Sequence, residues 1–248
     1  SLADGSDYLL ALSNFNSNFR SYDYIAEVGG AIGSMYGYVF DGVYQLSDFN
    51  VGPDGALTLK EGIVDISEHA GVPVTPGFIK YKDINNDGVI TPEDRTVIGN
   101  GQPDWFGGLS NTFNLYDFDL SFMLQFSVGG EVYNAQRLWN TQSKLENVNL
   151  LGEVTDRWSI TNASNKVPSA TGYISYDICS RFIEDGSYLR LKNVTLGYTL
   201  PRRLTRKAFI SHLRVYLTAQ NLWCLTAYSG FDPEVNMRGS PLMPAFDY

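Results

Sequence analysis

The sequence predicts an all-β protein built from antiparallel hairpins, and two observations support that prediction. Glycine occurs 24 times, tyrosine 16 times and phenylalanine 14 times in 248 residues, and long stretches of Ala, Leu, Glu and Lys are absent. Such a composition favours strands and turns over helices. The second observation is an apolar residue at every even position from Phe118 to Val128, with mostly polar residues between them, which is the period of a β-strand.

The first third of the chain predicts short strands separated by turns. Tyr36–Tyr44 mixes aromatic residues with glycine and aspartate, which is typical of short strands and turns. Residues 52–70 are polar and irregular and predict a loop that contains His69. Two prolines in Gly71–Gly77 exclude a helix and predict an extended connection.

The strand at Phe118–Val128 predicts one arm of a hairpin. Leu109, Phe113 and Leu115 occupy alternate positions just before it, so Tyr116 and Asp117 would form a tight turn. The apolar side of this strand carries three phenylalanines and no charge. That side would pack on a second sheet in a soluble sandwich, or face lipid in a membrane barrel, for which a tilted strand of about 9–11 residues suffices.

The second half predicts a long loop and then two more strands. Residues 131–165 are irregular and predict a loop with a short helical piece. From Tyr188 the alternation returns but changes phase near Lys192, which predicts a β-bulge. Another alternating strand begins at Leu213, and residues 241–248 predict no regular element.

An oxygen-rich turn at residues 83–94 is the strongest candidate for a binding site. Calcium takes six to eight oxygen ligands, and a calcium loop supplies protein oxygens from its positions 1, 3, 5, 7 and 12. The candidate ligands are Asp83, Asn85, Asp87, the carbonyl of Val89 and Asp94. Gly88 would permit the sharp turn. The alternative is a metal-free Asx turn, in which the same side chains accept backbone N–H groups.

The remaining composition excludes several function classes. A net charge of −9 disfavours nucleic-acid binding, because a surface that binds phosphates needs clustered Lys and Arg side chains. The only basic cluster in the sequence is Arg202–Lys207, which predicts a solvated turn. The sequence has no zinc spacing, nucleophile elbow or phosphate loop, so no catalytic residue and no enzymatic activity are predicted. Cys179 and Cys224 are too few for a disulfide framework, and free thiols are favoured over a single bridge.

Several long motifs resemble the SusC/RagA-type TonB-linked outer-membrane transporters. The most specific is Phe182–Pro201, and Leu213–Leu222 with Tyr228–Val235 continues the resemblance. Tyr36–Tyr44, the turn at 83–94 and the pair Arg157–Trp158 occur in the same order as in that family. The resemblance covers nearly the whole chain.

The resemblance implies a fold and a function. It implies part of a transmembrane β-barrel of about 22 strands with long extracellular loops. It also implies TonB-dependent import of oligosaccharides or peptides, a SusD-type surface lipoprotein as partner, contact with outer-membrane lipid, and the outer membrane of a Gram-negative, Bacteroidota-like cell. No cofactor is expected besides a structural Ca²⁺ ion.

Departures from the family pattern limit this expectation. The sequence shows no plug domain, no TonB box and no signal peptide, and stops before the last barrel strand. Residues 1–248 are therefore expected to form one partial C-terminal barrel region that does not transport by itself. The alternative is a soluble β-rich carbohydrate-binding module with a calcium-steadied loop. A glycoside hydrolase is a third class, for which no carboxylate pair stands out.

Overall fold

The computed structural model describes residues 6–11, 22–142, 149–173, 177–235 and 242–247. The chain forms two compact units. Unit 1 contains Ser1–Gln102, Val132–Glu184 and Val235–Tyr248, and unit 2 contains Pro103–Glu131 and Asp185–Glu234. No helix among the described residues combines the length and the apolar character needed to cross a bilayer.

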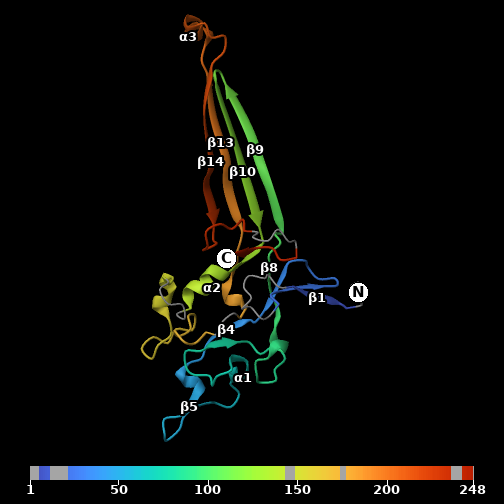
Figure 1. Ribbon diagram of the computed structural model, residues 1–248, viewed down its shortest axis with the longest axis vertical. Coiled ribbons are helices and arrows are strands. Elements are labelled where there is room, and N and C mark those ends of the chain that lie inside the picture. The colour runs from blue at the N-terminus through green and yellow to red at the C-terminus, as the bar shows by residue number, and fades with distance from the viewer. Residues whose placement is uncertain (1–5, 12–21, 143–148, 174–176, 236–241, 248) are drawn as a thin grey trace. The chain divides into compact units, whose positions relative to one another are not determined.

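Unit 2 is dominated by one antiparallel sheet of long strands, which lie side by side in Figure 1. The sheet has the order β14-β13-β10-β9, and its strands are β9 (Trp105–Leu115), β10 (Phe118–Val128), β13 (Tyr188–Thr199) and β14 (Arg214–Thr226). The predicted hairpin is confirmed, because Phe118 pairs with Leu115 across the turn at Tyr116 and Asp117. Tyr116 adopts a φ of 54°, as a tight turn requires of one residue.

The predicted bulge in the third long strand is also confirmed. The register between β10 and β13 shifts at Lys192, because Met123 pairs with Asn193 while Leu124 pairs with Leu191. The pairing of β13 with β14 shifts at the same place. The bulge therefore explains the change of phase in the sequence, since the extra residue returns the apolar side chains that follow to the same face as those before it.

Pairing places most of the apolar side chains of the four strands on one face, here named the apolar sheet face, together with Gly107 and the polar Asn111. Because paired residues share a face, the register identifies its members. They are Trp105, Leu109, Phe113, Leu115, Phe118, Leu120, Phe122, Leu124, Phe126, Val128, Leu189, Leu191, Val194, Leu196, Tyr198, Val215, Leu217, Ala219, Trp223 and Leu225. No charged residue lies among them.

The opposite face carries charged and polar side chains linked by hydrogen bonds, together with Phe106, Met123, Tyr188 and Tyr216. Arg214 donates from Nε and Nη2 to the two carboxylate oxygens of Asp119, at 3.0 and 2.5 Å. Thr195 and Thr218 share a hydrogen bond of 3.0 Å between their hydroxyls. The charged residues that the register pairs, Asp119, Arg190 and Arg214, therefore all lie on the side opposite to the apolar sheet face.

Unit 1 contains short strands and short helices around a core of aromatic residues. Tyr24, Tyr44, Tyr81, Tyr133 and Phe182 are each at most 1% exposed. Three small sheets have the orders β1-β2-β3-β8, β4-β7 and β5-β6, and a fourth, β12-β11-β15, contains a parallel pair. The strands are β1 (Tyr8–Ala11), β2 (Tyr24–Glu27), β3 (Ser34–Gly37), β4 (Phe40–Val43), β5 (Phe49–Val51), β6 (Leu57–Leu59), β7 (Ile79–Tyr81), β8 (Thr96–Asn100), β11 (Glu131–Asn134), β12 (Ile183–Asp185) and β15 (Phe246–Asp247).

The helices are short in both units. They are the α-helices α1 (Ser67–Ala70), α2 (Ala135–Thr141) and α3 (Arg202–Thr205), with 3-10 helices at Leu46–Asp48, Pro92–Asp94, Gly152–Asp156, Ser180–Phe182 and Arg206–Ala208. The loop with a helical piece predicted at 131–165 is confirmed in α2 and in the largely irregular described residues 149–165, and it is wrong only at 131–134, which form β11. Residues 143–148 of that prediction lie outside the described residues.

Two predicted irregular segments contain regular structure instead. Residues 52–70 form β6 and α1, and α1 ends at Gly71, whose φ of 69° supplies the left-handed cap of a helix end. The C-terminal segment contains β15, which pairs in parallel with β11 through only two residues. All three elements, β6, α1 and β15, are shorter than the sequence window in which periodicity is recognisable.

Candidate functional site

The aspartate loop, residues 83–94, follows β7 and is closed by its own side chains. Asp83 accepts hydrogen bonds from the backbone N–H groups of Asn86, at 2.6 Å, and Gly88, at 2.7 Å. Asn85 accepts from the N–H of Asp87, and Asp87 accepts from the N–H of Val89, at 3.0 and 2.9 Å. These contacts are Asx turns in series, and Gly88, at a φ of 88°, gives the chain its sharp reversal.

Asp94 closes the loop from inside unit 1, where its side chain is fully buried. Its two carboxylate oxygens accept from the backbone N–H groups of Ile84, at 2.9 Å, and Thr91, at 2.8 Å. Burial disfavours the charged carboxylate, but these backbone donors outweigh it and hold the pKa of Asp94 below its ordinary value. Asp94 therefore stays ionised at neutral pH and ties the two ends of the loop together.

The five predicted ligands lie in one turn, and their oxygen donors suit a hard cation such as Ca²⁺. Only three of the five predicted ligands are carboxylates, because the other two are the side chain of Asn85 and the backbone carbonyl of Val89. Within the described ranges, no group of three or more His, Cys, Asp or Glu side chains is arranged to hold a metal. Calcium binding at this loop stays a prediction, in which Asp83 and Asp87 would share their oxygens between backbone N–H groups and the ion.

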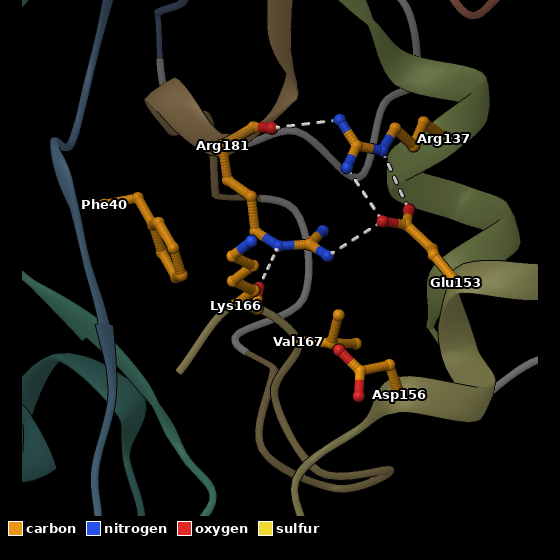
Figure 2. A pocket seen from close by; sticks show the side chains of 7 residues that line it. All are labelled: Phe40, Arg137, Glu153, Asp156, Lys166, Val167 and Arg181. Atoms are coloured by element: carbon orange, nitrogen blue, oxygen red, sulfur yellow. Dashed lines mark hydrogen bonds and ion pairs between the residues drawn. The ribbon is translucent and has the colours of Figure 1, made fainter. Parts of the chain in front are cut away.

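A pocket of about 370 Å³ in unit 1 contains an ion-pair network that the sequence did not indicate. Figure 2 shows the side chains of Arg137 and Arg181 directed at the carboxylate of Glu153. Arg137 donates from Nε and Nη2 to Glu153, at 2.8 and 2.7 Å, and from Nη1 to Glu184, at 3.2 Å. The remaining lining residues are Phe40, Asp156, Lys166 and Val167.

The network contains two arginines and two glutamates, so its charges balance. Arg181 is nearly buried, and its Nη2 donates to Glu153 at 3.3 Å while its Nε donates to the carbonyl of Lys166 at 2.9 Å. Burial disfavours the charged Glu153, but the two arginines outweigh that effect and lower its pKa below the ordinary value. The four residues join α2 to segments 16 to 47 positions away, which fixes the connection rather than providing chemistry.

His69 also has a partner that its sequence context did not predict. It lies on α1 rather than in a loop, and its Nε2 is 2.8 Å from Oδ2 of Asp177. Tyr81 donates to the same carboxylate oxygen at 3.2 Å and stacks on Tyr38, with ring centroids 4.9 Å apart. The partners are 96 and 108 residues apart along the chain, so no local motif reveals this cluster.

The cysteines and the second histidine give no reactive site in the described structure. Cys179 is buried and Cys224 is exposed, and both are free thiols. Burial raises the pKa of Cys179 to about 12, so that its thiol is protonated at neutral pH. His212 lies in the connection between β13 and β14.

The apolar sheet face exposes large hydrophobic side chains on all four long strands. Trp105, Leu217 and Leu225 are 74, 73 and 67% exposed, and many of its other members are at least one-third exposed. A contiguous apolar surface of this extent marks contact with a membrane or another protein. Its strands are 11 to 13 residues long, well above the usual strand length of about 5–6.

Known relatives of the chain are receptors that depend on TonB. TonB-dependent receptor P3 of Formosa agariphila is 35% identical over 237 residues, which cover 96% of this chain and 22% of that receptor. TonB-dependent receptor SusC of Bacteroides thetaiotaomicron is 29% identical over 172 residues, which cover 68% of this chain and 16% of SusC. No family model matches the chain.

A solved structure shares the fold. The RagAB peptide transporter superimposes with a TM-score of 0.68 and 22% identity, over 99% of this chain and 24% of the matched chain. The prediction of antiparallel hairpins belonging to a large β-barrel is therefore confirmed, and the comparisons give no support to the soluble carbohydrate-binding alternative. The chain spans about a fifth of the length of the curated relatives that it matches. It is a homologue of the SusC/RagA-type TonB-dependent receptors, corresponding to one segment of such a receptor.

Proposed function

We propose that this chain forms part of the wall of a TonB-dependent outer-membrane transporter. The observation that supports this best is the apolar sheet face, which is uncharged, exposed and built on strands long enough to cross a bilayer. Aromatic residues lie near both ends of these strands, with Trp105 at one end and the paired rings of Phe118 and Tyr198, 4.6 Å apart, at the other. Aromatic girdles at both membrane interfaces are typical of outer-membrane barrels.

The substrate class that we propose is oligosaccharides or peptides. One relative is SusC, and the fold matches a peptide transporter. We further propose a SusD-type surface lipoprotein and TonB as partners, and the outer membrane of a Bacteroidota-like cell as location, since relatives come from Formosa and Bacteroides. This chain contributes no catalysis in the proposal.

Fractionation of native cells tests the proposed location. The gene product that contains this chain is expected in the outer membrane, and its gel mobility is expected to change on boiling, because a closed barrel resists detergent until it is heated. Radiolabelled peptides and oligosaccharides, supplied to cells with and without the gene, then assign the substrate class. A soluble product of unchanged mobility would contradict the proposal and restore the binding-module alternative.

We also propose that the aspartate loop is a structural calcium site. Calcium at 100 times its dissociation constant is expected to stabilise the folded protein by about 2.7 kcal/mol, which raises the melting temperature. Asp87→Ala should remove that increase. Asp54→Ala is the matched control, because Asp54 also accepts a backbone N–H, that of Ala56, in an exposed turn. An unchanged melting temperature on adding calcium would leave the Asx turn as the whole role of the loop.

A further inference from the structure

The connection between β13 and β14 forms a basic cap at one end of the long sheet. The cap consists of Arg202 and Arg203 on α3 and of Arg206 and Lys207 on the following 3-10 helix. All four side chains are exposed, and residues 200–213 contain no Asp or Glu. None of the four forms an ion pair within the part of the chain that the structure describes. The cap is therefore a cluster of free positive charge in a chain whose net charge is −9.

The three arginines of the cap surround one concave space. Arg202, Arg203, Arg206 and Ser211 line a pocket of about 590 Å³. Each guanidinium offers several N–H donors in a planar fork, which matches the oxygens of a phosphate. A serine hydroxyl beside them adds one more donor. The pocket thus suits a phosphate group better than a carboxylate, which has only two oxygens to share among three arginines.

Exposed apolar side chains lie beside the cap. Phe209 is 99% exposed, Leu204 is 56% exposed and Ile210 is 38% exposed. Phe209 also adopts a φ of 59°, a left-handed conformation that is unfavourable for a bulky residue. In a turn surrounded by water, an aromatic side chain held outward in this way does not stabilise the fold. At a membrane interface the same arrangement is stable, because the aromatic and apolar side chains are then removed from water.

The cap lies at the same end of the sheet as the short turn of Tyr116 and Asp117. Phe118 pairs with Tyr198 near that end, and Thr199 pairs with Arg214 where the cap begins. Figure 1 shows α3 beyond the ends of the long strands. Short turns lie on the periplasmic side of outer-membrane barrels. The apolar sheet face therefore continues up to the cap, so that an apolar surface meets the arginine-lined pocket.

We propose that the basic cap binds the phosphate headgroup of an anionic phospholipid in the periplasmic leaflet, with the acyl chains lying along the apolar sheet face. The proposal rests on the proposed function, since it requires that this face contacts lipid. A cation near an anionic lipid surface contributes about fivefold to affinity, so two fully engaged arginines of the three already give more than about tenfold preference for an anionic over a zwitterionic lipid. Arginine holds the phosphate in two-point contacts, while Leu204 and Phe209 enter the interface.

Native mass spectrometry of the gene product in detergent tests the proposal. Phosphatidylglycerol and phosphatidylcholine with the same acyl chains are added in equal amounts, and bound copies are counted. The wild type is expected to retain phosphatidylglycerol at least about tenfold more than phosphatidylcholine. The variant Arg202→Gln/Arg203→Gln/Arg206→Gln should lose that preference. Phe209→Ser should weaken retention of both lipids equally.

A matched variant and a competing anion test whether the lipid preference comes from the basic cap. Lys60→Gln/Lys82→Gln/Arg157→Gln removes the same charge from exposed positions of unit 1 and should keep the preference. Inorganic phosphate at millimolar concentration should not displace phosphatidylglycerol, and complete displacement would overturn the assignment to a lipid. Equal retention of both lipids by the wild type, or an unchanged preference in the cap variant, would also overturn it.

Heat-modifiable mobility of each variant separates this proposal from the proposed function. A wild type without heat-modifiable mobility contradicts the transporter. A heat-modifiable wild type that shows no lipid preference contradicts only the basic cap. Should the triple variant fail to fold, Arg203→Gln alone is expected to lower the preference severalfold while the barrel remains closed.

Discussion

Phe122→Arg is expected to prevent most of the protein from inserting and folding in lipid vesicles, whereas Met123→Arg is expected to fold nearly as well as the wild type. The two residues are neighbours near the middle of β10, but their side chains point to opposite faces of the sheet. Phe122 belongs to the apolar sheet face. An arginine facing lipid near the bilayer midplane costs about 2–4 kcal/mol, while a polar interior tolerates it.

The measurement is the fraction of protein with unboiled, compact mobility after folding into vesicles. A cost of 2–4 kcal/mol corresponds to a decrease of about 30- to 1,000-fold in the folding equilibrium constant. Because both variants carry the same new charge at the same depth, any difference between them reports which face meets lipid. Equal losses in the two variants, or folding of the wild type without lipid, would contradict a membrane-facing role for this surface.

The long sheet was predictable because its information is local. Alternation from Phe118 to Val128 specifies a strand and its apolar side, and the pair Tyr116 and Asp117 specifies the turn. Even the bulge at Lys192 was visible as a change of phase. The continuity of the apolar face across four strands follows from pairing, since each paired residue must share the face of its partner.

Unit 1 was less predictable because its contacts join distant segments. The contact of His69 with Asp177 spans 108 residues, and the contact of Arg137 with Glu184 spans 47. Its strands are two to five residues long, too short for a period to be counted. The aspartate loop is the exception, because its hydrogen bonds run between residues that are close in sequence, and its geometry could therefore be predicted from spacing alone.

Arg137→Ala is expected to lower the free energy of unfolding by about 2–3 kcal/mol, because it leaves two half-buried or buried carboxylates without their main cation. Glu153 is 24% exposed and Glu184 is 12% exposed at their side chains. Arg137→Lys keeps the charge but not the two parallel hydrogen bonds to Glu153, so it should recover only part of the loss. Arg157→Ala, at an exposed position, is the control.

The loss of stability in Arg137→Ala should also depend on pH in a defined direction. The folded pKa of Glu153 lies below its ordinary value of 4.5, so the ionised carboxylate stabilises the fold above that pH. As pH falls through the lowered pKa, Glu153 becomes protonated and the contribution of its pairing disappears. The difference in denaturant-unfolding free energy between wild type and Arg137→Ala should therefore be largest near neutral pH and should shrink below pH 4.5. A double-mutant cycle with Glu153→Gln separates this pair from the rest of the network, and a coupling energy near zero would contradict the role assigned to Arg137.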